Sequence, residues 1–366
     1  MDTFSNNKIL QQISDYTKPS LGNYIETLES LFKNEDDAFP AVLQLAEDIV
    51  ALGVFPEDKL KLYELAGDYY YLKNQLDLSV LYYLMAFEVT NKVNPSSFTA
   101  ILANKICRSY YNMNKFQDAL YYINFALNYI DGLSKDDIIK LTFNCALCYK
   151  NIGLYKEALD ELLKLDKLIG NSENPKYFDI ITLESNCYIK LELYNKAIEK
   201  YLELLKTIEG DVVKQVISML NLAKAYIYAG EEFEAEKCVS ETRLLIRHLS
   251  PKTPYKLTIY TDLAKVYLRL NNINEAKKYL MRAHKLAKES KNIAQQKVIL
   301  NYMFTICDKN QSLSLAGFIK DQMLYIININ SENSGWLLIF KLLNFYNKLE
   351  KNHQVNEILT VILNIK

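Results

Sequence analysis

Glycine and proline are scarce in this chain, with 10 and 7 among 366 residues. Average proteins contain about 12% of the two together. Their scarcity argues against β-sandwiches, barrels and glycine-rich nucleotide folds, and it favours a nearly all-helical chain. Charge of either sign is not in excess, because 43 basic and 44 acidic residues leave a net charge of −1. The chain therefore has no global positive field to hold a polyanion.

Long apolar segments are also lacking. No apolar run approaches the ~18 residues of a membrane span, and the first residues, Met1 to Asn7, do not resemble a signal peptide. We expect a cytoplasmic protein without membrane contact. Its six scattered cysteines are then expected to be reduced thiols.

Motifs of common enzyme and metal sites are missing as well. The sequence contains no Walker loop, GxGxxG, HExxH or GxSxG. Its CxxC, Cys145 to Cys148, lacks two further zinc ligands at suitable spacing. His248, His284 and His353 lie more than 30 residues apart. We predict a non-catalytic protein without metal or cofactor, with cysteines packed as small buried residues and histidines on solvated helix faces.

A repeat organises what is present. Six tyrosines recur at intervals of 38 to 41 residues: Tyr70, Tyr110, Tyr149, Tyr188, Tyr226 and Tyr267. Small residues stand three before each tyrosine (Gly67, Cys107, Ala146, Ser185, Ala223, Ala264) and nine after it (Ser79, Ala119, Ala158, Ala197, Ala235, Ala276). We call these tyrosines the ruler tyrosines. Small residues at fixed spacing predict helices that cross their partners closely, with the tyrosine ring filling the gap beside the crossing.

Each unit is predicted to be two antiparallel helices. In the third unit the helical apolar period covers Leu141 to Asn151, breaks at Gly153 and resumes over Tyr155 to Leu168. The corresponding breaks in the other units are Asn74, Asn114, Glu192, Gly230 and Asn271. Glycine and asparagine tolerate the left-handed conformation that ends a helix tightly. A hairpin of this kind buries only one face by itself, so its stability requires stacking on its neighbours.

The flanking segments are weaker but also helical. Residues 1–59 are predicted to form an N-terminal cap with helices over 21–32 and 38–52, and residues 60–290 the six repeats. Residues 291–366 are predicted to form degenerate pairs with helices over 294–308, 312–327, 336–349 and 354–365. The expected fold is an all-α solenoid, a right-handed superhelix of about nine helix pairs that forms one continuous domain.

The helix junctions carry a family resemblance. The strings from Asn112 to Tyr122 and from Asn151 to Leu159 resemble the junction of the tetratricopeptide repeat, whose usual unit is 34 residues. The longer units here, rich in tyrosine and lysine, resemble the sensor domains of peptide-pheromone-regulated proteins of Gram-positive bacteria. That resemblance implies a quorum-sensing role: a short peptide clasped on the concave face, and transcription regulated through a DNA-binding part.

The chain departs from that family at its beginning. A helix-turn-helix needs about 55–65 residues, whereas helix pairs begin here by about Leu21, after at most one short helix over 8–14. We therefore expect the DNA-binding part to lie on another chain or in a segment removed from this one, and no direct DNA binding by the chain as given. Family members that dephosphorylate response regulators use a polar residue in an N-terminal bundle, for which Gln11 and Gln12 are loose candidates.

The candidate binding residues lie on the first helix of each unit, which lines the inner groove of tetratricopeptide repeats. Asparagine can pair with an extended peptide backbone, and arginine and lysine can hold carboxylates. The candidates are Asn104, Arg108, Tyr111, Asn112, Lys150, Asn151, Asn186, Lys190, Lys224, Tyr228, Lys265 and Arg269. Glu64, Asp68 and Tyr71 would form an acidic end.

Several alternatives stay open at this point. The inner face of a solenoid is expected to be polar even if it contacts only water and binds no peptide. The chain could bind partner proteins constitutively as a scaffold, or bind a response regulator. The expected partner is a short peptide or a protein, and a homodimer is left open.

Overall fold

The computed structural model describes residues 21–52, 56–93, 96–169, 174–250, 253–329 and 335–363. The described residues form helices only. The predicted short helix over 8–14, together with Gln11 and Gln12, lies outside them. No helix in the described part of the chain is both long and apolar enough to cross a bilayer.

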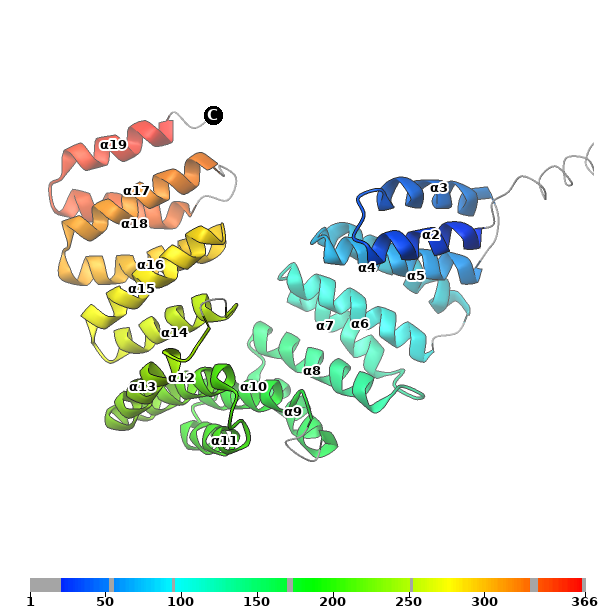
Figure 1. The fold of residues 1–366 in the computed structure, drawn as a ribbon, viewed down its shortest axis with the longest axis horizontal. Helices are drawn as coiled ribbons and strands as arrows, with labels where there is room; N and C mark the ends of the chain where they lie inside the picture. The colour runs from blue at the N-terminus through cyan, green and yellow to red at the C-terminus, as the bar shows by residue number, and fades with distance from the viewer. Residues whose placement is uncertain are drawn as a thin grey trace, which may run out of the picture. The chain divides into compact units, whose positions relative to one another are not determined.

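The described helices follow one another as antiparallel pairs (Figure 1). The pairs are α2 (Leu21–Lys33) with α3 (Phe39–Leu52), α4 (Pro56–Leu72) with α5 (Leu76–Val93), α6 (Ser97–Asn112) with α7 (Phe116–Leu127), α8 (Lys135–Ile152) with α9 (Tyr155–Ile169), α12 (Val212–Ala229) with α13 (Glu232–Ile246), α14 (Lys256–Arg269) with α15 (Ile273–Glu289), α16 (Ile293–Asn310) with α17 (Leu313–Ile329), and α18 (Trp336–Lys348) with α19 (Asn352–Leu363). Between α9 and α12 the chain forms α10 (Tyr177–Lys190) and α11 (Tyr194–Thr207). The all-α, tetratricopeptide-like solenoid is therefore confirmed, and the eighteen described helices agree in number with the roughly nine pairs predicted.

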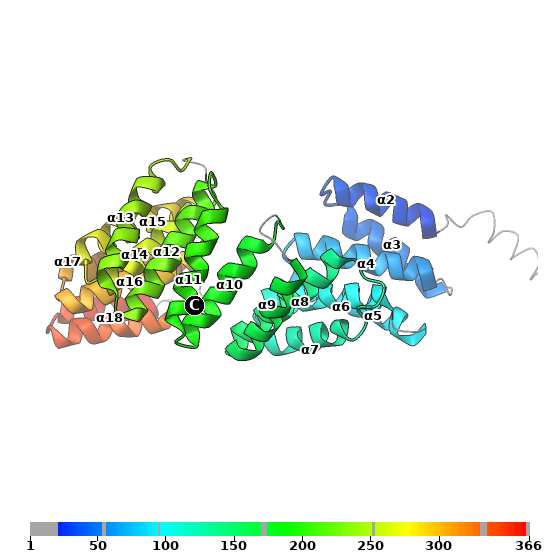
Figure 2. The same cartoon turned by 90° about the horizontal axis from the view of Figure 1, so that it is seen from below.

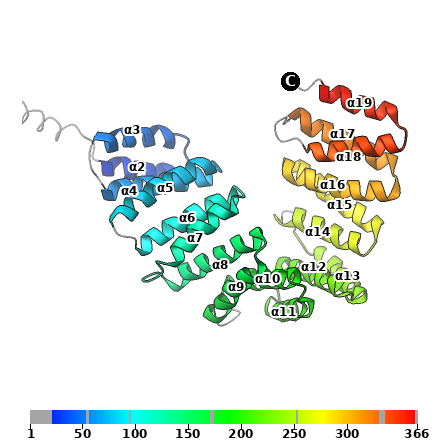
Figure 3. The ribbon, with the colours of Figure 1, turned by 180° about the vertical axis from the view of Figure 1, so that it is seen from behind.

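The chain divides into two compact units, one ending at Cys187 and the other beginning at Tyr188. In unit 1 the pairs follow each other in chain order from α2 to α9 (Figure 2). In unit 2 the same order runs from α12 to α19 (Figure 3). The predicted division at residues 59 and 290 stays a prediction.

The small positions of the repeat form the helix crossings. Every small residue three before or nine after a ruler tyrosine is buried, and Ala158 and Ala197 have no exposed surface. At Gly67 an added Cβ would lie 2.4 Å from the Tyr83 ring, so α4 and α5 approach too closely for a larger side chain. The predicted packing is confirmed.

Three of the six ruler tyrosines fill the gaps beside these crossings by stacking on a second tyrosine. Tyr70 stacks on Tyr82, and Tyr110 on Tyr122, with ring centroids 5.4 and 5.8 Å apart. Tyr267 stacks on Tyr279 in the same way at 5.8 Å. Each partner comes 12 residues later, on the second helix of the pair. Stacked rings add specific stabilisation to the area that they bury.

Left-handed residues end the first helices where the sequence predicts breaks. Asn74, Asn114 and Asn271 have φ of 58° or 59°, and Gly153 and Gly230 have 94° and 83°. Glu192, the charged exception, adopts the same conformation with φ of 62°. The turns are therefore set by position in the repeat, even where the side chain is not the favoured one.

The predicted helix bounds are wrong in one place. α8 begins at Lys135 rather than at Leu141. The Ser134 side chain accepts a hydrogen bond from the Asp137 N–H, and Asp136 and Asp137 occupy the first turn. Capping and the helix dipole thus extend the helix through a polar segment that has no apolar period.

The prediction that all three histidines lie on solvated helix faces is wrong for His284. His248 and His353 are exposed as predicted, but His284 on α15 is only 5% exposed. Its Nε2 is 3.2 Å from Gln322 Oε1, and its ring contacts Phe318 edge-on. Its Nδ1 is buried without a hydrogen-bond partner among the described residues. The ring packs between pairs because helix α17 covers it, which a search for catalytic motifs does not detect.

Overpacking at a crossing should destabilise the protein. Ala158→Leu places extra atoms at a fully buried position and should lower the free energy of unfolding by roughly 1–3 kcal/mol. Lys156→Leu, at an exposed position of the same helix, should change it by less than about 0.5 kcal/mol. Urea unfolding of both variants checks this. Equal stability of the two variants would show that the repeat misplaces the core.

Acid should destabilise unit 2 through His284. Burial lowers the pKa of His284, aided by the nearby Lys288 and opposed by the hydrogen bond to Gln322. The unfolded chain therefore takes up a proton near the ordinary pKa of about 6.5, before the folded protein does. Stability is fully present above that pH and falls as the pH drops below it. Comparing urea midpoints at pH 7.5 and 5.5, we expect His284→Gln to lose less stability than wild type, and identical losses would contradict this.

Candidate functional site

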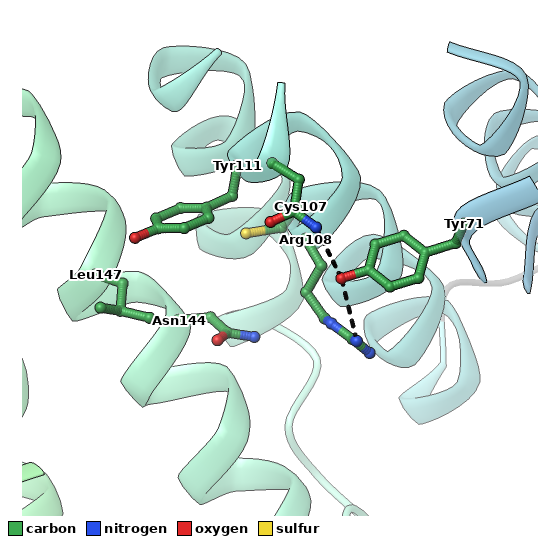
Figure 4. Close-up of a pocket in the computed structure, with 7 residues that line it drawn as sticks. Tyr71, Cys107, Arg108, Tyr111, Asn144 and Leu147 are labelled. Carbon is green, nitrogen blue, oxygen red and sulfur yellow. Dashed lines mark hydrogen bonds between the residues drawn. The ribbon is translucent and has the colours of Figure 1, made fainter. Parts of the chain in front are cut away.

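A pocket of about 190 Å³ lies on the first helices of unit 1 (Figure 4). Its lining residues come from α4 (Tyr71), from α6 (Cys107, Arg108, Tyr111, Asn112) and from α8 (Asn144, Leu147). We call the exposed side chains of the first helices the first-helix face: α4, α6 and α8 in unit 1, and α12, α14 and α16 in unit 2. Three predicted site residues, Arg108, Tyr111 and Asn112, line this pocket together.

Tyr71 is the centre of the polar contacts in the pocket. Arg108 Nη2 donates to its hydroxyl at 3.3 Å, and Asn112 Nδ2 donates at 2.9 Å (Figure 4). The Arg108 guanidinium also lies over the Tyr71 ring, 4.9 Å from the centroid. Both lone pairs of the hydroxyl are then occupied. Its own proton has no acceptor among the described residues and is available to a ligand.

The one charged group in the pocket lining is a donor, the Arg108 guanidinium, and the uncharged amide oxygens of Asn112 and Asn144 supply acceptors. No carboxylate is among its described lining residues, and Arg108 has no carboxylate partner in the described part of the chain. The Tyr111 hydroxyl accepts from Asn151 Nδ2 at 2.7 Å, so its proton too remains free to donate. Leu147 and the tyrosine rings supply apolar walls. A positive charge with directed donors and apolar walls suits a carboxylate attached to a small apolar group.

The asparagines of the site also join neighbouring repeats. Asn144 Nδ2 donates to Asn104 Oδ1 at 2.7 Å, between α8 and α6. Asn151 donates to Tyr111, and to the Leu147 carbonyl on its own helix at 3.0 Å. These amides therefore hold repeats together, and a peptide backbone would have to share or replace their bonds.

The predicted acidic end is partly neutralised. Lys105 Nζ lies 2.7 Å from Glu64 and 2.8 Å from Asp68. The Tyr83 hydroxyl donates to Asp68 as well, at 2.5 Å. Two carboxylates share one ammonium, so this end keeps one negative charge.

The other nine predicted residues do not line the pocket; Asn104 and Asn151 contact residues that do, whereas Lys150, Asn186 and Lys190 lie apart from it. Lys150 is half-buried and lies 3.5 Å from Asn151 Oδ1. Asn186 is half-buried on α10 in unit 1, whereas Lys190 is exposed and belongs to unit 2.

The remaining four predicted residues lie together in unit 2. Lys224 and Tyr228 stand four residues apart on α12, and Lys265 and Arg269 four apart on α14. Asp262 joins the two lysines, at 3.3 Å from Lys224 and 2.9 Å from Lys265. The Arg269 guanidinium lies 4.7 Å from the Tyr228 ring centroid. We call these four residues with Asp262 the α12–α14 cluster.

The prediction missed one repeat position that completes both groups. Lys105, Asn144, Asn221 and Asp262 all stand five residues before a ruler tyrosine. Each contacts a predicted or acidic-end residue: Lys105 the carboxylates, Asn144 Asn104, and Asn221 and Asp262 Lys224. The sequence signal for these residues is their common spacing from the ruler tyrosines.

The cysteines are buried, as predicted. The Cys148 thiol 3.8 Å away, together with burial, raises the pKa of Cys107 far above its usual range. Burial raises the pKa of Cys145 to about 12 and those of Cys187, Cys238 and Cys307 to about 11. These thiols stay protonated at neutral pH and act as packing groups. No group of three or more metal-ligating side chains occurs among the residues that the structure describes.

Comparisons with known proteins agree with this architecture. Residues 215–289 match the family model described as tetratricopeptide repeat. No curated protein matches the chain in sequence. The fold is similar to that of the apo form of RapI, with a TM-score of 0.55 and 13% identity over 74% of this chain and 99% of that one.

Two further structures cover nearly the whole chain. The apo quorum sensor NprR from B. thuringiensis has a TM-score of 0.54 and 14% identity, over 96% of this chain and 99% of that one. A Rap protein complexed with Competence and Sporulation Factor has a TM-score of 0.54 and 12% identity, over 94% and 97%. At these identities the likeness is one of fold.

Proposed function

We propose that this chain is a non-catalytic regulatory protein that binds a short signalling peptide on the first-helix face of unit 1. The peptide places a carboxylate in the pocket, against Arg108 and the Tyr71 hydroxyl. Binding is passed to an attached or partner DNA-binding part, and so regulates transcription.

The chemistry of the pocket is the observation that carries this proposal. Arg108 is held over the Tyr71 ring without a carboxylate partner among the described residues, in a pocket of about 190 Å³. That volume suits one terminal residue or one acidic side chain, so the rest of a peptide would lie along the asparagines beside the pocket. Capture of a peptide carboxylate by fixed donors is a known mode of recognition.

The structural neighbours support the regulatory part. One is named a quorum sensor, and another was solved with Competence and Sporulation Factor bound. Because Tyr71, Asn112 and Leu147 come from three successive first helices, a ligand among them would bias the angles between adjacent pairs. Small rotations per repeat accumulate along a solenoid and provide a route for the signal.

A constitutive protein scaffold is the second candidate. The Asn112–Tyr71 and Asn151–Tyr111 bonds favour it, because they couple successive repeats without any ligand. A scaffold would retain a protein partner and no short peptide.

Removal of the pocket cation should weaken peptide binding. The probe is a degenerate hexapeptide library with free carboxyl termini, from which the full chain retains its tightest peptide. Titration calorimetry with that peptide should show a loss of about 1.5–3 kcal/mol for Arg108→Ala, as for a charge-assisted hydrogen bond. Asn112→Ala should cost about 1 kcal/mol.

The matched control is Lys156→Ala, an exposed cation on the second helix α9 of the same unit. It should bind the peptide like wild type. Weaker binding by the control together with unchanged binding by Arg108→Ala would place the ligand elsewhere and refute the pocket.

A further inference from the structure

The α12–α14 cluster carries more positive charge than its one carboxylate neutralises. Lys224 and Lys265 share Asp262, whose side chain is 24% exposed. Arg269 stands beside them without a carboxylate partner in the described part of the chain. Three cations and one carboxylate leave two positive charges in excess on a partly buried face.

The cations of this cluster are held in fixed positions. Arg269 lies on the Tyr228 ring, and Tyr228 stacks on Tyr194 at 5.9 Å between centroids. Lys265 Nζ lies over the Tyr302 ring of α16, at 5.4 Å. Lys224 also donates to Asn221 Oδ1 at 3.1 Å. Such preorganised donors lose little freedom when they bind an anion.

Burial and the neighbouring cations both disfavour the charged form of Lys224. Burial lowers the pKa of Lys224 in spite of the attraction of Asp262, and Lys265 and Arg269 lower it further. Burial alone would raise the pKa of Asp262, but the two lysines hold it below its usual range. An additional anion at the cluster would relieve this repulsion.

The positions of the few arginines also favour anion binding at this cluster. The chain has only five arginines among its 43 basic residues. Two of them lie over the rings of first-helix tyrosines without a carboxylate partner among the described residues: Arg108 over Tyr71 in unit 1, and Arg269 over Tyr228 in unit 2. A stacked guanidinium keeps its N–H edge for bidentate pairing with a carboxylate.

We propose that the α12–α14 cluster is a second anion subsite, in which Arg269 with Lys265 and Lys224 binds a carboxylate of an acidic peptide segment. This inference rests on the proposed function in taking the ligand to be a peptide. Carboxylate is the anion that an unmodified peptide supplies, at its terminus or on an aspartate or glutamate side chain, and Arg269 can pair with it through two parallel N–H bonds. The exposed part of the Tyr228 ring, which is 38% exposed, offers an apolar surface to the peptide beside the charge.

The test uses the full chain and a degenerate hexapeptide library. Half of the library has free carboxyl termini and half is amidated, and a phosphoserine set is included. Peptides retained by the protein are separated from unbound ones and identified by mass spectrometry. The amidated half distinguishes a terminal carboxylate from an aspartate or glutamate side chain.

We expect wild type to retain a set enriched in carboxylates. Arg269→Gln should lower recovery of part of that set about tenfold or more. Arg269→Lys keeps the positive charge but loses the two parallel N–H donors of the guanidinium. This variant should restore part of the peptide recovery. Arg282→Gln is the matched control, since Arg282 also lies on a tyrosine, Tyr279 at 5.3 Å, but on the second helix α15. It should leave recovery unchanged.

Three results would overturn the inference: equal recovery by wild type and Arg269→Gln, no enrichment of acidic peptides, or preference for phosphoserine. Arg269 is exposed, and circular dichroism checks that its variants fold. If the peptides that wild type retains are lost by Arg108→Ala but all retained by Arg269→Gln, this subsite is refuted and the proposed function stands. A set lost only in Arg269→Gln supports the subsite and refutes the pocket in unit 1.

Discussion

Close crossing of two helices at a small residue is the constraint on which the rest of this structure depends. Alanine, serine or cysteine at the crossing lets two helices approach, and at Gly67 even a Cβ would meet the Tyr83 ring. A ruler tyrosine then fills the gap beside the crossing, in three pairs by stacking on a second tyrosine. A left-handed residue closes the hairpin at the same distance each time. Each pair still needs its neighbours to cover the remaining apolar face, so one local geometry generates a stacked array.

The same geometry places polar groups at equivalent points on successive first helices. Contacts across pairs therefore repeat: Asn112 reaches back to Tyr71, and Asn151 reaches back to Tyr111. Where arginine occupies this face, it lies on a tyrosine and keeps one edge for a ligand. A repeat with varied side chains thus forms distinct donor sites on a common frame, as peptide recognition requires.

The sequence predicted the fold closely because the fold is set by local spacing. Small residues, breaks and the flanking helices all lie where the period places them, and the breaks hold even at Glu192. The site was predicted less well, since it depends on contacts between repeats. Helical spacing predicted Arg108 and Asn112, but it did not predict Asn144 and Asp262, because these two take part through contacts with the preceding repeat, with Asn104 and with Lys224. His284 was misplaced because burial by α17 comes from stacking, which no single-helix pattern reports.

Native mass spectrometry of the protein, isolated without denaturation from the cells that make it, tests the central claim most directly. The pocket of unit 1 predicts a second species, heavier by the mass of one short peptide, whose fragments give a sequence with a free carboxyl terminus or an acidic residue. The species should be absent from Arg108→Ala isolated in the same way. A peptide retained equally by wild type and Arg108→Ala, or a stable complex with a protein partner in place of any peptide, would contradict the account.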